Sequence, residues 1–200
     1  MSMPEVPSED KERAHEKQQA ADCSVEYVQS GMVGGWALVV QGQGEANIAQ
    51  IRQGLAAYEA TGATLERPYS LALLAEAYGN VGQAAEALPI MAEALHLVDT
   101  RGDRWCEAEL YRLKGDLLLA LSGQHQPEVE ARFQQALAIA RRRQAKSWEL
   151  RAAMSLAQLW QRQGQRAEAR ELLAPIYGWF TEGFDTADLQ EAKALLEELS

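Results

Sequence analysis

The sequence is poor in the residues that most often carry enzyme chemistry. Its 200 residues include only two cysteines, Cys23 and Cys106, and three histidines. The cysteines lack the short spacing of a metal site, and a disulfide between them is an open alternative that a reducing cytoplasm disfavours. No histidine lies in a His-x-x-x-His or Glu-x-x-His frame. We therefore expect no metal site and no cysteine nucleophile, which would need a histidine and an orienting group nearby.

Strand patterns and long apolar runs are also missing. No run of alternating β-branched residues bounded by turns is present, and the apolar stretches are short and interrupted, so we expect neither a sheet nor a membrane span. Residues 1–7 lack the basic and apolar regions of a secretory signal. Gly31, Gly34 and Gly35 precede an apolar helical pattern and not a strand–turn–helix phosphate site. These absences predict a non-enzymatic cytoplasmic chain without a cofactor.

What the sequence does contain is an internal repeat of about 40 residues. Alanine, leucine, glutamine, glutamate and arginine dominate, a helix-forming mixture, and 47% of the residues are apolar. Small residues recur at one place in successive helical patterns, with spacings of 40, 40 and 42, at Gly35, Ala75, Gly115 and Ala157. Glycine turns fall into the same frame at Gly42, Gly82 and Gly164. A fixed period of this size is typical of an all-α solenoid of helical hairpins.

The period also predicts how the chain is divided. Residues 1–12 are polar and contain prolines, and we expect them to be disordered. Residues 13–200 are expected to form a single solenoid domain, with repeats at about 28–61, 68–101, 105–142 and 148–180. Two prolines, Pro89 and Pro175, fall in the second helices of their repeats, where each should remove a backbone hydrogen bond and kink the helix.

The recurring small residues have a packing explanation. We expect Gly35, Ala75, Gly115 and Ala157 to lie where the first helix of a hairpin approaches the second closely, because a larger side chain would hold the helices apart. Bulky, small and bulky residues alternate here as in tetratricopeptide repeats, whose standard length is about 34 residues. The longer period adds about a turn and a half of helix or linker.

A last helix, at 186–199, is expected to cap the array. Asp185 or Thr186 can cap its N-terminus. Leucine and alanine side chains form one stripe, at Leu189, Ala192, Leu196 and Leu199. Such a terminal element covers the apolar face of the final repeat.

The net charge of −10 is unevenly distributed along the chain. Residues 141–170 contain eight basic and two acidic residues, whereas residues 181–200 contain one basic and six acidic residues. Favourable helix electrostatics explain the basic segment, since Arg141, Arg142 and Arg143 close a helix. The alternative is a local anion-binding face. The overall acidity disfavours duplex nucleic acid as a partner.

Several segments resemble a known family. The segments 67–78, 109–115 and 177–189 are similar to the C-terminal tetratricopeptide region of bacterial signalling proteins, in which an adenylate/guanylate cyclase domain and an AAA-type ATPase commonly precede the repeats. The similarity covers about residues 31–199 and implies a regulatory or protein-interaction module. This chain contains no Gly-x-x-x-x-Gly-Lys-Ser/Thr segment and has no room for a cyclase domain, so the enzyme activities of those proteins are not implied.

The candidate site is the inner face of the solenoid. In tetratricopeptide folds the first helices line a groove that binds a peptide or helix. Carrying that geometry over predicts the following groove positions: Trp36, Tyr69, Glu76, Asn80, Glu109, Arg112, Asp116, Arg151, Met154, Gln158 and Arg162. We expect Arg112, Arg151 and Arg162 to form a cluster that favours acidic or carboxylate-bearing segments. The alternative is a solvated inner face without a ligand. Trp36 is either an exposed aromatic anchor for a partner or is buried under the N-terminal segment.

Three functions remain open at this stage. The leading hypothesis is a protein-interaction scaffold in bacterial signalling, with a protein or peptide partner that includes a cyclase or ATPase component among the candidates. The second is a self-association module that forms a homo-oligomer. The third is a binder of an anionic ligand through the basic fourth repeat.

Overall fold

The computed structural model describes residues 46–60, 62, 66–102, 104–122 and 127–200. Within these ranges all regular secondary structure is helical. The helices are α2 (Ala46–Ala60), α3 (Arg67–Asn80), α4 (Ala84–Arg101), α5 (Glu107–Ser122), α6 (Pro127–Arg143), α7 (Lys146–Arg162), α8 (Arg166–Tyr177) and α9 (Ala187–Glu198). The expected disorder of residues 1–12, the first helix of the first repeat, Gly35, Trp36 and Cys23 lie outside the described residues.

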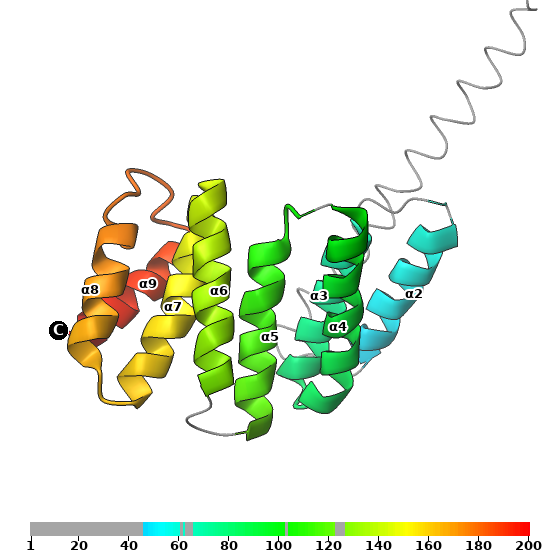
Figure 1. The fold of residues 1–200 in the computed structure, drawn as a ribbon, viewed down its shortest axis with the longest axis horizontal. Helices are drawn as coiled ribbons and strands as arrows, with labels where there is room; N and C mark the ends of the chain where they lie inside the picture. Colours follow the sequence, from blue (N-terminus) through cyan, green and yellow to red (C-terminus); the bar gives the residue numbers. More distant parts are fainter. Residues whose placement is uncertain (1–45, 61, 63–65, 103, 123–126) are drawn as a thin grey trace, which may run out of the picture.

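The helices are arranged in two layers. They succeed one another in chain order, from α2 at one end of the molecule to α8 and α9 at the other (Figure 1). Antiparallel hairpins pair α3 with α4, α5 with α6 and α7 with α8, and each hairpin packs on the next. In one layer α3 contacts α5, α5 contacts α7 and α7 contacts α9. Among the described residues, α4 makes no such contact with α6, nor α6 with α8. The second layer therefore fans apart, and the layer of α3, α5, α7 and α9 is the inner face of a curved solenoid.

Glycine makes two of the tight hairpin turns possible. Gly82 connects α3 to α4 with a φ of 79°, and Gly164 connects α7 to α8 with a φ of 82°. A side chain strains the backbone in this left-handed region, which glycine adopts freely. The recurrence of glycine at these two positions in the sequence therefore reflects turn geometry.

Close helix packing explains the small residue at Gly115. A Cβ atom built there would clash with the ring atoms Cε1 and Cδ1 of Phe133 on α6. Ala75 and Ala157, at the same place in the neighbouring hairpins, are fully buried. Phe133 is also fully buried. The prediction that small residues let the paired helices approach is confirmed at Gly115.

Apolar side chains between the layers hold the array together. One group of buried residues joins α2, α3, α4 and α5, and includes Ile51, Tyr58, Met91 and Leu110. A second joins α6, α7, α8 and α9. Each hairpin buries apolar side chains between its own two helices and against the neighbouring hairpins, as expected of a repeat protein.

The helix α9 closes the array, as the sequence predicts, but two details differ. Its buried residues are Leu189, Ala192, Leu195 and Leu199, while Leu196 is only partly buried. Leu195 and Leu196 both lie about one turn from Ala192 and from Leu199, so the spacing does not choose between them, and packing against α7 and α8 buries Leu195. Thr186 occupies the N-cap position but makes no capping hydrogen bond. Its hydroxyl instead donates to the carbonyl of Gly183, at 2.7 Å.

The two internal prolines lie inside helices, Pro89 in α4 and Pro175 in α8. Both side chains are exposed, so their rings do not displace core residues. Searched over the described residues, no helix is at once long enough and apolar enough to cross a membrane.

Candidate functional site

The inner face has a buried carboxylate at its centre, that of Glu109 on α5. Its two oxygens accept hydrogen bonds from Arg112 on the same helix, from Nη2 at 2.6 Å and from Nε at 2.9 Å. Arg151 on α7 reaches the same carboxylate, with Nη1 2.8 Å from Oε1. Only 3% of the Glu109 side chain is exposed. One carboxylate therefore ties two guanidinium groups from successive hairpins together.

The same ion-pair network extends to α3 and α9. Arg112 Nη1 donates to Oδ2 of Asp116 at 2.6 Å, and its Nη2 lies 3.9 Å from Oε1 of Glu76 on α3. Arg151 Nε lies 3.8 Å from Oδ1 of Asp188 on α9. We call the six residues Glu76, Glu109, Arg112, Asp116, Arg151 and Asp188 the inner-face network. It links the four helices of the inner layer that the structure describes, α3, α5, α7 and α9.

The two carboxyls bonded to Arg112 have opposite pKa shifts. Burial alone would raise the pKa of Glu109, but Arg112 and Arg151 hold it below its ordinary value. Burial raises the pKa of Asp116 to about 6. Arg112 opposes this rise only in part, and the negative charges of Glu109 and Glu76 add to it. The Asp116 side chain is 40% exposed. Burial likewise acts to lower the pKa of Arg112, but its carboxylate neighbours raise it, so the guanidinium stays charged.

The net charge of the network corrects one prediction. When every group is ionised, its four carboxylates outnumber its two guanidiniums, which leaves a charge of −2. Arg112 and Arg151 already share Glu109, and Arg162 lies eleven residues beyond Arg151, about 16 Å further along α7. The expected cluster of three arginines is therefore not formed, because Arg112 and Arg151 are paired with carboxylates of the chain itself and Arg162 lies elsewhere.

A pocket opens beside the network, between α3 and α5. Its volume is about 200 Å³, and its charged lining residues are Glu76 and Asp116. Leu113, Leu117 and Ala120 line it from α5. We call this space the α3/α5 pocket. It combines an apolar wall with two carboxylates at the edge of the network.

The remaining predicted groove residues are placed as follows. Asn80 lines the α3/α5 pocket and Gln158 is exposed on α7 near Arg162, where a second hollow separates α7 from α9. Met154 is buried in the core and does not present its side chain to the groove. Trp36 lies outside the described residues.

An aromatic cluster at the start of the inner helices was missed by the sequence reasoning. The ring centroid of Trp105 lies 5.2 Å from that of Tyr69 on α3 and 6.1 Å from that of Trp148 on α7. Burial raises the pKa of Tyr69, and the negative charge of Glu109 adds to the rise. The available signal was that Trp105 and Trp148 both stand near the start of an inner helix in consecutive repeats.

Several basic side chains of the fourth repeat form ion pairs or hydrogen bonds with neighbouring groups. Glu149 forms ion pairs with Arg141 at 3.0 Å and with Lys146 at 2.7 Å. Burial would raise the pKa of Glu149, but these two partners hold it below its ordinary value. Two further arginines bind the end of the chain, since Arg166 donates to the carbonyl of Glu198 and Arg170 to the hydroxyl of Ser200. These pairings favour the electrostatic explanation of the basic segment over an anion-binding face.

The chemistry of the described residues offers no metal centre. No group of three or more histidine, cysteine, aspartate or glutamate residues in this part of the chain could hold a metal ion. His96 is exposed, and Cys106 is buried. What the inner face can do chemically is present fixed charges and a shaped pocket.

Comparison with known proteins identifies the fold. No protein-family model matches the sequence, and no curated protein does. Among solved structures, the chain is similar to a protein from Podosopora anserina described as a kinesin light chain with nearly identical TPR-like repeats, with a TM-score of 0.62 and 18% identity over 88% of this chain and 86% of that one. A single-substitution variant of that protein matches with a TM-score of 0.61 and 19% identity, over 88% of this chain and 93% of that one. The chain is thus an all-α, TPR-like solenoid of helical hairpins.

Proposed function

We propose that this chain is a non-catalytic scaffold that holds a protein partner along its inner face. The observation that carries the proposal is the inner-face network, in which charged side chains from four helices meet beside a pocket. Charged groups buried between helices are a poor means of stabilising a fold, because desolvation offsets much of their attraction. Their presence on the concave layer favours recognition, the usual role of that surface in helical-repeat proteins.

The biological setting is proposed from the sequence. The resemblance of segments 67–78, 109–115 and 177–189 to the repeat region of cyclase–ATPase signalling proteins supports a regulatory role in bacterial signalling. A cyclase or AAA-type ATPase on another chain is then the first partner to examine. Proteins encoded beside this one are the natural candidates.

To test the scaffold proposal, the affinity of a purified candidate partner is measured for matched variants of this chain. Asn80→Arg and Gln158→Arg place a large cation at exposed positions of the inner layer, whereas Ala138→Arg and Glu171→Arg do so on the outer layer. We expect the inner pair to weaken binding and the outer pair to leave it unchanged. Equal binding by all four variants would reject the inner face as the contact surface.

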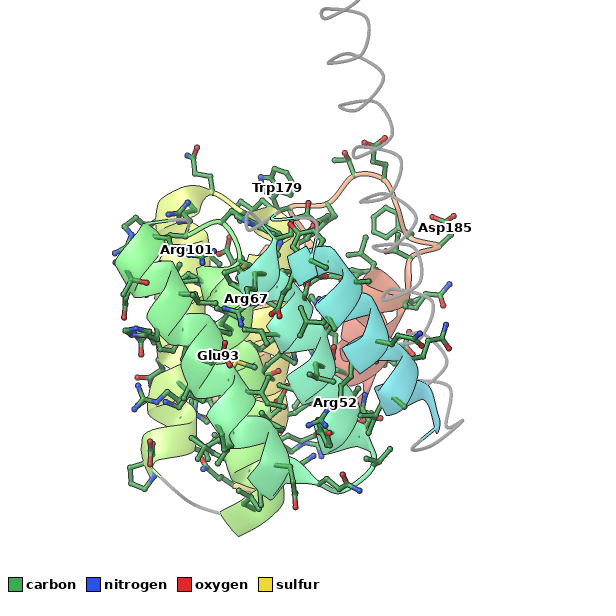
Figure 2. The ribbon with its side chains drawn as sticks, turned by 90° about the vertical axis from the view of Figure 1, so that its right-hand side faces the viewer. Arg52, Arg67, Glu93, Arg101, Trp179 and Asp185 are labelled. Atoms are coloured by element: carbon green, nitrogen blue, oxygen red, sulfur yellow. The ribbon has the colours of Figure 1, made fainter. Side chains whose placement is uncertain are left out.

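Self-association is the second candidate function, and exposed aromatic residues favour it. Trp105, Trp179 and Phe184 are 41%, 57% and 48% exposed. Figure 2 shows Trp179 at the upper edge of the molecule, above Arg101 and Arg67. Aromatic residues are enriched at protein interfaces. Light scattering over a range of concentrations tests this function, since a mass that rises with concentration and falls back in Trp179→Ser would support it.

A further inference from the structure

We propose that two copies of this chain associate through a two-fold interface centred on Trp179. In it, the arginines at the end of α6 of each copy face the acids of the α8–α9 loop of the other copy. This inference rests on self-association, the second candidate function, and adds to it the surface and the symmetry of the contact. The segment 178–186, between α8 and α9, is called the aromatic loop below.

The aromatic loop presents large apolar side chains to the solvent. Trp179 is 57% exposed and Phe184 is 48% exposed. Exposed apolar side chains that lie together on a folded chain commonly mark an interaction site. Tryptophan is also among the residues that most often carry the binding energy of a protein interface. Trp179 is therefore the best candidate for the centre of a contact.

The loop holds Trp179 in a fixed position. The N–H of Trp179 donates to the carbonyl of Ile176 at 3.3 Å, and that of Phe180 to the carbonyl of Tyr177 at 3.1 Å. The ring of Phe180 packs against the core of α6 to α9. From below, Nζ of Lys146 lies 5.4 Å from the centroid of the Trp179 ring. An anchor that is already ordered loses less conformational entropy when it binds.

Exposed charges of both signs surround this anchor. Arg142 and Arg143 end α6 and are exposed, and Glu182 and Asp185 are exposed on the aromatic loop. None of these four side chains forms an ion pair with another residue in the part of the chain that the structure describes. They are therefore available to pair with charges of a second molecule.

The two signs of charge lie on opposite sides of Trp179. Figure 2 shows Asp185 on one side of Trp179 and Arg101, at the end of α4 in the outer layer, on the other. The helix α6 belongs to the same outer layer, and its last residue, Arg143, precedes Lys146 by three positions. A two-fold axis that passes through Trp179 within the interface places the basic side of one copy on the acidic side of the other. The same charged contact then forms twice.

The overall charge of the chain makes such a pairing necessary for association. Each copy carries a net charge of −10, so two copies repel one another. Local pairing of opposite charges offsets this repulsion and selects one orientation over others. A central aromatic contact surrounded by polar and charged side chains is also the usual arrangement of a protein interface.

The aromatic centre is tested by sedimentation equilibrium over a range of concentrations. We expect the parent chain to form a dimer and Trp179→Ser to raise the dimer dissociation constant about tenfold or more. The control is Leu121→Ser, which removes a side chain of similar exposure, 50%, at the end of α5, and should leave the dissociation constant unchanged. A Trp179→Ser chain that associates like the parent would overturn the proposal. A parent chain that is monomeric at every concentration would overturn it together with self-association.

Charge reversal tests the two-fold pairing. One variant combines Arg142→Glu with Arg143→Glu, and the other combines Glu182→Arg with Asp185→Arg. Each variant alone brings like charges together at both contacts, so we expect each to dimerise at least about tenfold more weakly than the parent. An equimolar mixture pairs opposite charges at both contacts again and should recover dimerisation.

The mixture also separates this interface from self-association in general. If the parent dimerises but the mixture associates no better than its two components, the interface is wrong and another surface carries the self-association. The scaffold function is judged separately, because the cation substitutions on the inner face do not alter the aromatic loop.

Discussion

At the scale of single residues, Glu109 organises the inner face. It is 3% exposed and accepts two hydrogen bonds from Arg112 while pairing with Arg151. The two arginines come from α5 and α7, so this one carboxylate joins adjacent hairpins. Without it, two buried or half-buried guanidiniums would lie side by side with less compensating charge.

Replacing Glu109 should therefore destabilise the fold. We expect Glu109→Gln to lower the free energy of unfolding by about 3–5 kcal/mol, the range for removing one partner of a buried ion pair. Because the pKa of Glu109 is held below its ordinary value of 4.5, this stabilisation is present above that pH and is lost as the pH falls below it. Urea unfolding measures the effect, with the exposed Glu171→Gln as the control. A loss no larger than that of the control would contradict this role.

Asp116 should behave in the opposite way. Its pKa is raised to about 6 from 3.8 by burial and by Glu109 and Glu76, against Arg112 and Arg151. The folded chain then holds more protons than the unfolded chain between these two values, so this group lowers stability as the pH rises through that window. We expect Asp116→Asn to melt at a higher temperature than the parent near neutral pH, with the difference shrinking toward pH 3.8. A lower melting temperature near neutral pH would show that the bond to Arg112 dominates.

Part of this site could be predicted from the sequence. Glu109, Arg112 and Asp116 are spaced for contacts along one helix, and the repeat frame placed Glu76 and Arg151 on the same layer. The pairing of Arg151 with Glu109 could not be predicted, because it depends on the angle between hairpins. Arg162 was grouped with the other two arginines by layer alone, although its distance along α7 separates them.

At the scale of elements, the period of about 40 residues allowed most of the helical hairpins to be predicted from the sequence. A small residue is required at Gly115 because the ring of Phe133 packs against it. The same place in the neighbouring hairpins also has a small residue, so the pattern is visible in the sequence. The stripe on α9 was less well predicted, because Leu195 and Leu196 are adjacent and only packing against α7 and α8 selects Leu195 for burial. The absent N-cap bond at Thr186 also depends on the preceding turn, where its hydroxyl binds Gly183.

Removal of α9 tests whether it caps the array. The helix buries Leu189, Leu195 and Leu199, each contributing about 1.5–3 kcal/mol before the entropy of ordering the helix. We expect truncation after Glu182 to lower the melting temperature and to promote association through the exposed face of α7 and α8. Differential scanning calorimetry and light scattering measure the two effects. A truncated chain that stays monomeric and melts like the parent would identify α9 as a tail without a capping role.

At the scale of the whole molecule, the chain is a curved solenoid whose inner layer presents charge. The two layers differ in packing: the inner helices contact one another, whereas the described outer helices α4, α6 and α8 fan apart. A partner along the inner face can therefore reach side chains from several hairpins at once. The outer layer presents separated helices with exposed small and charged residues.

Site-specific photo-cross-linking of a bound partner tests this central claim most directly. A photoreactive amino acid is placed at Asn80 or Gln158 on the inner layer, and at Ala138 or Glu171 on the outer layer, all of which are exposed. We expect the partner to be cross-linked from the inner positions and not from the outer ones. Cross-links from the outer positions alone would contradict it.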